Sequence, residues 1–530
     1  MKNTYFKRIK NRSILLLCVF LILSSCEVLD EESLTQVSTE KFYQNESDAL
    51  DALTAAYARL KSGNGYYKQV FLSALYASSD QGLSTFLFRD FKTGTITNTN
   101  PNLTPMWRDI YFGIRDANNV IANVGSIDMD EQLKSRIIGE ARFLRGLHYF
   151  NLVRCFGEVP LRTEPIDLDS SESEGLPISS IVDIYEVIIG DLEYASQNCW
   201  GRNEVINNYS NDLGRATKAA AHAMLAKVYL RIASSKRTAL LGVEGNNKYL
   251  SFAESELNYY QLAKNQCDLA INQSGFQLES SFEGWNTIFN PENGNNPEML
   301  FEVQGSSIVG QGTAVSNLFT PKDSGLSGTG FGGSNKLKPK FINNRLNKND
   351  PRYQYTIIKE YQNNTRSFAI NPGSIGYVPT LFSTGNSVGT LWQIWTSKYI
   401  DPEATTEYTS RQNWHIIRLA DVHLMRAEAM AEISQDPSFA NNDFNLLRNR
   451  VQMSDFNGGG MSIENFRILL LKERAVELYM EGHRFFDLTR MGVLDEYCRF
   501  LHGNTVGQRQ PEDYFWPIPI SETAANSNID

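Results

Sequence analysis

The hydrophobic pattern of the N-terminal half is helical. Between residues 46 and 271, apolar residues recur three and four positions apart, a spacing that puts them on one face of an α-helix. The first such segment follows Ser47, a residue type that caps helix N-termini, and carries Ala49, Leu50, Leu53 and Ala56 on its apolar face. The same spacing predicts helices over residues 48–60, 107–124, 131–154, 180–197, 216–232 and 254–271.

The predicted helix at residues 216–232 has small side chains along one side. Ala219, Ala223 and Ala226 would let a neighbouring helix approach closely. Helix pairs that stack in sequence form a solenoid-like array of the tetratricopeptide type. The strict 34-residue signature of that repeat is absent, so the pattern predicts helix pairs without a motif match.

The pattern changes after residue 290. Residues 290–297 are rich in Asn, Pro and Gly, which indicates turns, and glycine dominates residues 305–333. A long irregular segment of this kind within a folded chain is usually either functional or disordered. Short strands are expected at residues 299–304, 353–361 and 391–400.

Helices return near the C-terminus. They are expected at residues 416–432, 442–452 and 462–490, and Ser462 with Glu464 forms a good start for the last one. The predicted fold is therefore mainly α, with a tetratricopeptide-like helix-pair scaffold, an irregular loop-rich half that binds the ligand, and a few short strands.

The N-terminus has the features of a lipoprotein signal peptide. Five basic residues precede an apolar run at residues 14–23, and the sequence Leu-Ser-Ser-Cys ends at Cys26. The run is too short for a membrane-spanning helix, which needs about 20 residues. Residues 1–25 are therefore predicted to be cleaved off, and the thiol of Cys26 to carry the lipid that tethers the protein to a membrane. An ordinary secretory signal with a coincidental cysteine is the alternative.

The charge of the chain excludes some partners. The formal net charge is −10, and it falls to about −15 without the signal peptide, which contains five basic and no acidic residues. A protein this acidic does not neutralise phosphates over a broad face, so nucleic acid and anionic lipid surfaces are excluded as expected partners.

The cysteines of the mature chain do not form a motif. Cys155, Cys199, Cys267 and Cys498 lie far apart, and no Cys-x-x-Cys occurs. Zinc or thioredoxin-like chemistry therefore has no support. Disulfides are possible outside the cytoplasm, but a chain of this length can bury a large core without them, so the four are expected to be buried thiols.

One long motif makes the chain resemble a known family. Residues 472–492, KERAVELYMEGHRFFDLTRMG, resemble the hallmark of the SusD/RagB family of outer-membrane nutrient-binding lipoproteins. Three other stretches are similar to segments of the same family: IRLADVHLMRAEA at 417–429, NPEMLF at 296–301 and PIPISE at 517–522.

This resemblance implies a location and a partner. Family members sit on the outer face of the outer membrane as a lid on a SusC-like TonB-dependent transporter, to which they pass glycans or other large nutrients. Acidic residues after Cys26 loosely resemble the family's surface-export signal. The resemblance also divides the mature chain into a SusD-like helical region at 26–289 and a C-terminal RagB/SusD region at 290–530, packed together as one globular unit.

Three glutamates on the last predicted helix raise the question of catalysis. Glu473, Glu477 and Glu481 recur every four residues and would face the same way, which invites a metal-binding or acid/base interpretation. A dimetal site would need Glu-x-x-His, and this spacing is absent. We therefore expect a structural ion-pair network, with partners from Arg474, Arg484 and Arg490 and from Arg418, Asp421 and Glu428 on the preceding helix.

Other catalytic motifs are missing from the sequence. The six histidines do not form His-x-x-x-His or His-Glu-x-x-His, and no nucleophile elbow, dinucleotide fingerprint or Walker A loop occurs. The sequence thus predicts no catalytic residue, no metal site and no cofactor. Two carboxylates suffice for glycoside hydrolysis, so a glycan hydrolase stays open as an alternative.

Aromatic rings on irregular segments are the candidate ligand contacts. A ring face can stack on a pyranose while neighbouring Asn, Gln and Ser side chains bind its hydroxyls. Any one of these rings can instead be core or loop packing. The basic residues Arg89 and Lys92 would suit an anionic ligand. The candidate rings are Tyr66, Tyr67, Phe86, Phe88, Trp285, Phe331, Trp392 and Trp395.

The function expected from the sequence is capture of an oligosaccharide or similar nutrient without catalysis. The protein would be lipid-anchored at the outer membrane, exposed on the cell surface, and would deliver its ligand to a SusC-like transporter. The alternatives are a lipid-anchored glycan hydrolase and a helical-repeat scaffold that binds only protein.

Overall fold

The helices and strands described below belong to the segment Asn45–Asp530, which forms a unit separate from Met1–Gln44. The signal peptide and Cys26 lie outside the described residues. The computed structural model describes residues 42–83, 86–165, 175–208, 212–321, 324–327, 333–337, 341, 350–358, 360–362, 367–370, 380–384, 387–391, 394–502 and 509–529.

The six long helices predicted for the N-terminal half are present, with boundaries that differ by a few residues. The first begins two residues earlier than expected, because Asn45 and not Ser47 is its cap. The Asn45 side chain accepts from the N–H of Asp48, and the Asp48 carboxylate accepts from the N–H of Asn45. The helices are α3 (Glu46–Ala58), α6 (Leu103–Asn123), α7 (Glu131–Phe156), α8 (Ile181–Asn198), α10 (Lys218–Leu240) and α11 (Glu256–Ile271).

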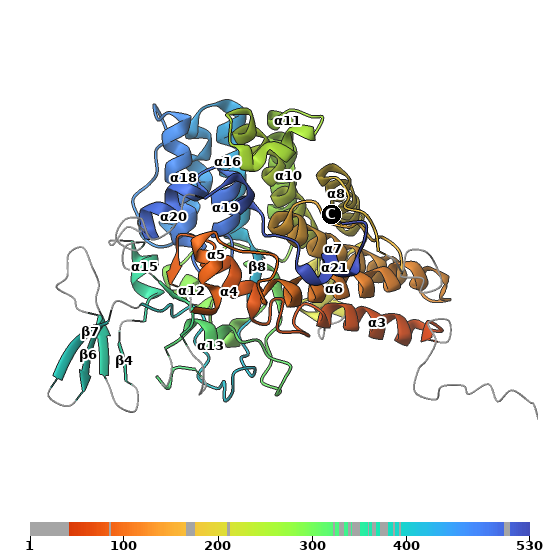
Figure 1. Ribbon diagram of the computed structural model, residues 1–530, viewed down its shortest axis with the longest axis horizontal. Coiled ribbons are helices and arrows are strands. Elements are labelled where there is room, and N and C mark those ends of the chain that lie inside the picture. The colour runs from red at the N-terminus through yellow and green to blue at the C-terminus, as the bar shows by residue number, and fades with distance from the viewer. Residues whose placement is uncertain are drawn as a thin grey trace, which may run out of the picture. The chain divides into compact units, whose positions relative to one another are not determined.

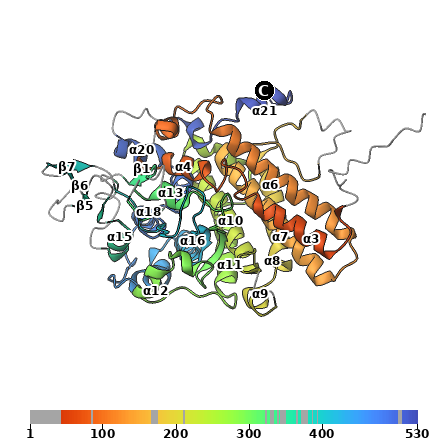
Figure 2. The same ribbon diagram turned by 90° about the horizontal axis from the view of Figure 1, so that it is seen from below.

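These helices pack as neighbours in sequence order. Figure 2 shows α3, α6, α7 and α8 side by side, and α8 and α11 both contact α10. Ala219, Ala223 and Ala226 of α10 are fully buried, so the small side chains do allow the close approach expected from the sequence. The protein is mainly helical and has the tetratricopeptide-like helix arrangement predicted for it.

The C-terminal half contains a two-stranded sheet that packs against α10 of this scaffold. Strand β2 (Met299–Val303) pairs antiparallel with β8 (Trp414–Arg418), and Glu302 lies opposite His415. Helix α16 (Leu419–Ser434) follows β8 directly and packs against α10 and α11 (Figure 1). The expected helix at 416–432 therefore begins as a strand, because Trp414 to Arg418 pair with β2 and are all buried.

The predicted helix at 462–490 is broken. Helix α18 (Ile463–Glu477) ends before Leu478, and α19 (Arg484–Arg490) begins after a turn. In this turn Met480 and Gly482 have φ angles of 64° and 80°, a region that a helix does not use and that glycine adopts at low cost. Glu481 therefore lies in the turn between α18 and α19 and not on the same helix as Glu473.

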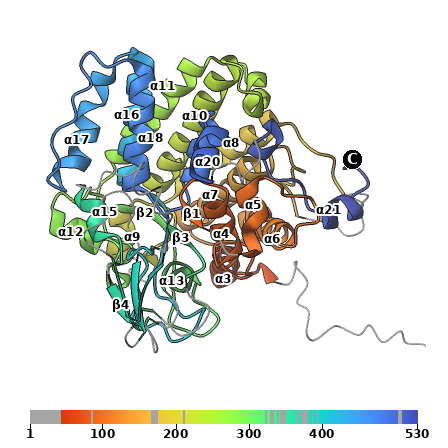
Figure 3. The same cartoon turned by 60° about the vertical axis from the view of Figure 1, so that its left-hand side comes forward.

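The strand predicted at 353–361 begins as a helix. Asp350 caps α15 (Pro351–Tyr355), and Pro351 occupies its first turn, where proline is favoured. The expected strand at 391–400 is reduced to single bridges at Ile394 and Thr396. A four-stranded antiparallel sheet lies at one side of the unit (Figures 1 and 3), formed by β4 (Glu360–Gln362), β5 (Ser367–Ile370), β6 (Thr380–Thr384) and β7 (Ser387–Leu391).

Shorter elements complete the described part of the chain. None of its helices is long and apolar enough to cross a membrane. The shorter elements are α4 (Val70–Ala77), η1 (Phe86–Phe88), α5 (Arg89–Thr93), η2 (Val124–Ser126), α9 (Arg202–Asn208), η5 (Glu244–Ser251), α12 (Phe282–Thr287), η6 (Pro291–Asn293), α13 (Val315–Phe319), η7 (Pro437–Ala440), α17 (Asn441–Asn449), α20 (Leu494–His502), η9 (Pro511–Tyr514), α21 (Ile520–Ala525), β1 (Gly82–Leu83) and β3 (Lys336–Leu337).

Candidate functional site

Two of the predicted ligand-binding rings, Tyr66 and Tyr67, lie in the core beside helix α4. They are 0% and 4% exposed, and their ring centroids are 4.3 Å apart. Both hydroxyls accept hydrogen bonds from the side-chain amide of Asn151 on α7, at 2.7 Å for Tyr67. Burial raises the pKa of Tyr67 to about 12, so the phenol keeps its proton at neutral pH. In the structure these two rings connect the turn before α4 to α7.

An aromatic cluster connects the buried ring of Phe88 with Tyr66. Phe88 packs on Phe91, Phe91 and Phe71 both contact Trp516, and Phe71 contacts Tyr66. The structure thus links Tyr66, Tyr67 and Phe88 to Trp516 through the rings of Phe71 and Phe91. Trp516 comes from the C-terminal segment, and its position was not predicted.

Trp285 and Trp395 lie elsewhere in the fold. Trp285 is fully buried in α12, where it stacks on Phe282 at 6.2 Å and belongs to a separate small core cluster. Trp395 is 5% exposed and donates its indole N–H to the carbonyl of Gly333.

The remaining predicted ligand contacts are only partly covered by the structure. Phe86 lies in η1, but its side chain is not among the described ones, and Phe331 and Trp392 lie outside the described residues. Arg89 is exposed at the start of α5, and Lys92 on the same helix has its pKa lowered by partial burial and by Arg89.

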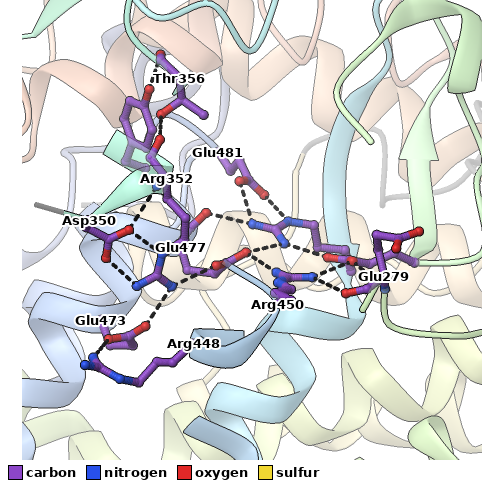
Figure 4. Close-up of polar contacts among 12 residues, drawn as sticks. Glu279, Asp350, Arg352, Thr356, Arg448, Arg450, Glu473, Glu477 and Glu481 are labelled. Atoms are coloured by element: carbon purple, nitrogen blue, oxygen red, sulfur yellow. Dashed lines mark hydrogen bonds and ion pairs between the residues drawn. The ribbon is translucent and has the colours of Figure 1, made fainter. Parts of the chain in front are cut away.

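The predicted ion-pair network is present, with Glu477 at its centre (Figure 4). The fully buried carboxylate of Glu477 accepts from Arg352 at 3.0 Å, from Arg418 at 2.8 Å and from Arg450 at 2.6 Å. These arginines come from three separate places in the sequence: α15, the end of β8 and the end of α17. The network therefore ties α18 to three other segments.

Two further glutamates extend the network. Arg418 binds both carboxylate oxygens of Glu481, at 2.8 and 2.9 Å, and also donates to Glu298 at 2.8 Å. Lys398 donates to Glu481 at 2.8 Å and to the carbonyls of Glu477 and Tyr479. The Arg418 side chain thus contacts three carboxylates and is completely buried.

The arginines expected to pair with these glutamates have other partners. Arg474 binds Asp421 and Asp487, and Arg484 forms a bidentate pair with Asp80. Arg490 pairs with Glu428 and Asp487. The expected ion-pair network is present and includes Arg418, but Arg352 and Arg450 were not predicted, because no local spacing in the sequence links them to Glu477.

The electrostatics of the network suit a structural role. Burial alone would raise the pKa of Glu477, but Arg450, Arg418 and Arg352 hold it well below its usual value. Burial alone would lower the pKa of Arg418, and Glu481 and Glu477 instead raise it. A general acid needs a carboxyl group that is protonated near neutral pH, and Glu477 is held ionised.

The cavities beside the network are small. One cavity of about 30 Å³ is lined by Glu481, and a second of the same volume lies near it, lined by Arg474 and Asp487; each leaves room for no more than a few waters. In the part of the chain that the structure describes, no group of three or more His, Cys, Asp or Glu side chains is arranged to hold a metal ion.

A larger open groove of about 440 Å³ runs beside helix α6. Its walls come from α6, from residues 160–164 and from the start of α21. Trp107, Tyr111 and Phe112 supply aromatic surface, and its volume is that of a pocket for a small ligand. The groove was not predicted, because the spacing of these rings on α6 equally fits a helix face that packs into the core.

Two family models together match most of the chain. The model described as "SusD family" matches residues 286–530, and the model described as "Starch-binding associating with outer membrane" matches residues 27–230. A SusD-like protein of Formosa agariphila is 26% identical over 567 residues, which cover 96% of each chain.

Solved structures share the fold. A "Laminarin binding SusD-like protein" aligns with a TM-score of 0.68 and 24% identity over 92% of this chain and 99% of its own. A structure with a xylogluco-oligosaccharide aligns with a TM-score of 0.68 and 21% identity over 90% of this chain and 97% of its own. Since the family models and the relatives agree over almost the whole length, the chain belongs to the SusD/RagB family.

Proposed function

We propose that the protein is a cell-surface lipoprotein that binds an oligosaccharide and delivers it to a SusC-like TonB-dependent transporter in the outer membrane. The observation that carries this proposal is the pair of family matches, which cover residues 27–230 and 286–530. One of the two models is described as starch-binding and associated with the outer membrane.

The names of proteins with the same fold support carbohydrate as the ligand class. One is described as laminarin-binding, and another was solved with a xylogluco-oligosaccharide. Both ligands are glucose-rich polysaccharides or fragments of them. We extend this ligand class to the present chain as a neutral glycan, to be identified by experiment.

Membrane attachment is proposed through Cys26. A lipid on its thiol would tether the folded unit Asn45–Asp530 by the segment that precedes it. One acyl chain alone is a marginal anchor, so a durable attachment requires more than one chain at this cysteine. The transporter partner is proposed from the family alone.

The glycan contacts are proposed at one ring of the N-terminal half and two rings of the loop-rich half. Five of the candidate rings are at most 7% exposed, and we propose that they stabilise the loops by packing in the core: Tyr66, Tyr67, Phe88, Trp285 and Trp395. Phe86, Phe331 and Trp392 remain the rings proposed to stack on the sugar.

Binding is tested with the full-length protein in detergent by isothermal titration calorimetry. Laminarin, xyloglucan and starch oligosaccharides serve as ligands. At least one is expected to bind, and Phe331→Ala and Trp392→Ala are each expected to weaken binding about fivefold, because stacking of an aromatic ring contributes about 1 kcal/mol. Phe439→Ala is the matched control, since the Phe439 ring is 52% exposed on another segment.

Other outcomes would favour the alternatives. Release of reducing ends from any of these glycans would show a hydrolase, and a failure of all glycans to bind to folded protein would contradict the receptor. Cys26→Ala is expected to move the protein from the membrane fraction to the soluble fraction, and unchanged membrane association would contradict the lipid anchor.

A further inference from the structure

The groove beside α6 combines aromatic surface with charged side chains. Phe112 is 37% exposed, and Tyr111, which is partly buried, lies next to it and places its ring 5.0 Å from that of Trp107. The hydroxyl of Tyr111 donates to the carbonyl of Pro160, so its ring is held in place. The guanidinium groups of Arg59 and Arg115 lie over the ring of Phe112, at 5.5 and 5.0 Å from its centroid. The fixed ring of Tyr111 beside this cationic edge provides a surface on which a sugar can pack.

Most charged groups of the groove already have partners. Arg108 pairs with Asp109 at 2.8 Å, and Arg115 pairs with Asp116 at 2.7 Å. The Glu522 carboxylate accepts from the indole N–H of Trp107 at 3.1 Å. These groups are therefore largely satisfied within the protein.

Arg162 is different. Its backbone is fixed, because its N–H donates to the hydroxyl of Tyr149 and its carbonyl accepts from Asn118. Within the described part of the chain, its guanidinium makes no hydrogen bond or ion pair. The exposed Glu164 nearby does not pair with it.

Arg162 and Tyr111 both line the groove. Burial raises the pKa of the Tyr111 phenol, Tyr149 and Glu522 add to this rise, and Arg162 opposes it. An arginine offers paired N–H donors in a planar fork that matches a carboxylate or a sulfate. In a chain with a net charge of −10, a guanidinium that lines this groove and has no partner among the described residues indicates a ligand that brings its own negative charge.

We propose that this groove is a second saccharide site that binds an anionic sugar, whose ring stacks on Tyr111 and Phe112 and whose carboxylate or sulfate pairs with Arg162. The inference rests on the proposed glycan-binding function and adds to it an anionic substituent and a separate location. It would allow the protein to hold an acidic branch or unit of a glycan at a distance from the ring-bearing loops.

The test uses calorimetry on the full-length protein with three probes of matched length: an oligogalacturonate, a sulfated galactan oligosaccharide and a neutral galactan oligosaccharide. We expect at least one anionic probe to bind more tightly than the neutral one. Arg162→Gln should weaken the anionic probe at least tenfold and leave neutral binding unchanged. Phe112→Ala should weaken the anionic probe as well.

Matched controls come from the surface. Arg499→Gln removes an exposed arginine that pairs with Asp495, and Phe439→Ala removes an exposed ring; neither should change binding. Thermal unfolding of each variant checks that the fold is intact, as expected since the Arg162 side chain makes no contact that holds the backbone.

The outcomes separate this inference from the proposed function. Equal binding of an anionic probe to wild type and Arg162→Gln, or equal binding of neutral and anionic probes, would overturn the groove site. If the anionic probes do not bind while a neutral glycan binds and is insensitive to Phe112→Ala, the groove site is wrong and the proposed glycan-binding function is retained. If no oligosaccharide binds, both proposals are wrong. Preference for uronate or for sulfate identifies which anionic group the site takes.

Discussion

The buried guanidinium of Arg418 is stable only because several carboxylates surround it. Its guanidinium is removed from water and would be strongly destabilising alone, but Glu298, Glu477 and Glu481 all accept from it. Replacing only one partner of such a cluster leaves the others buried without compensation, and this typically costs about 3–5 kcal/mol. Position 418 therefore tolerates little besides arginine.

Glu302 lies next to this cluster, and burial disfavours the ionised form of its carboxyl group. Burial raises its pKa to about 7, although the N–H of Asn295 and the amide of Asn413 favour the charged form. Between its unfolded pKa, about 4.3, and 7, the folded protein binds the proton more tightly than the unfolded chain does. The contribution of Glu302 to the free energy of unfolding is therefore largest at low pH, and it is lost as the pH rises through 7.

We predict that Glu302→Gln removes this pH dependence. Relative to the variant, wild type should lose about 2 kcal/mol of unfolding free energy between pH 5.5 and pH 8, measured by urea denaturation. His415, 3.3 Å away, has its pKa lowered to about 4 by burial and titrates in both proteins, so the difference isolates Glu302. Glu131→Gln changes a side chain that is 80% exposed and is the control; its unfolding free energy should depend on pH as that of wild type does. Parallel curves for wild type and Glu302→Gln would contradict the assignment.

At the scale of elements, the turn between α18 and α19 decides where the network forms. Because the chain leaves the helix after Glu477, Glu481 turns toward Arg418 and Lys398 instead of continuing the row of glutamates. The carbonyl of Met480 accepts from the hydroxyl of Tyr399, which holds the left-handed residue in place. Gly482 then lets the chain re-enter a helix.

Two glycine substitutions are predicted to have opposite effects. Gly482→Ala should lower stability by about 1–2 kcal/mol, because φ is 80° there and the added methyl group would meet the Trp414 ring at 3.2 Å. Gly190→Ala should raise stability by about 0.5–1 kcal/mol, because Gly190 lies within α8 with open space around it. Chemical denaturation measures both. Equal effects of the two substitutions on the free energy of unfolding would show that the positive φ at Gly482 does not restrict which residue the turn accepts.

The helices could be predicted well from the sequence because their cause is local. The three- and four-residue spacing of apolar side chains located α6, α7, α8, α10 and α11 within a few residues, apart from the last two turns of α10. Errors arose where distant contacts decide. Trp414 to Arg418 form a strand only because β2 lies alongside, and β2 is more than 100 residues away.

The candidate site was harder to predict for the same reason. An aromatic residue between polar neighbours has the same sequence signature whether it stacks on a sugar or, as Tyr66 does, fills the core. The partners of Glu477 could not be read from helical spacing, because Arg352 lies 125 residues before it. The groove on α6 needs residues from three separate segments, which no local pattern brings together.

On the scale of the whole molecule, buried polar contacts link the two halves. The side chain of Arg231 on α10 donates to the carbonyl of Phe486 and to the hydroxyl of Thr489 on α19. Lys227 on α10 pairs with Asp421 on α16 at 2.7 Å. A large hydrophobic core also contains side chains from both halves. The halves therefore depend on each other for their stability.

We predict that the unit unfolds in one cooperative transition in scanning calorimetry. Arg484→Ala should lower its midpoint by about 3–5 °C without splitting it, because the buried carboxylate of Asp80 loses its bidentate partner and a unit of this size loses about 1 °C per kcal/mol. At temperatures below this transition, the variant should bind glycan with the affinity of wild type. Arg499→Ala, at an exposed ion pair, should leave the midpoint unchanged. Two resolved transitions in wild type would show that the halves are independent.

The four buried thiols make the protein convenient for single-site labelling. Cys155, Cys199, Cys267 and Cys498 are all free and buried, as expected from the sequence, and burial raises the pKa of Cys498 to about 11 and raises those of the other three. Maleimide reagents react with exposed thiolates, so they will pass over these positions at neutral pH. A cysteine introduced at Leu87, which is 70% exposed between Phe86 and Phe88, would then carry a fluorophore beside the proposed sugar-binding loops and report each arriving ligand as a change in emission.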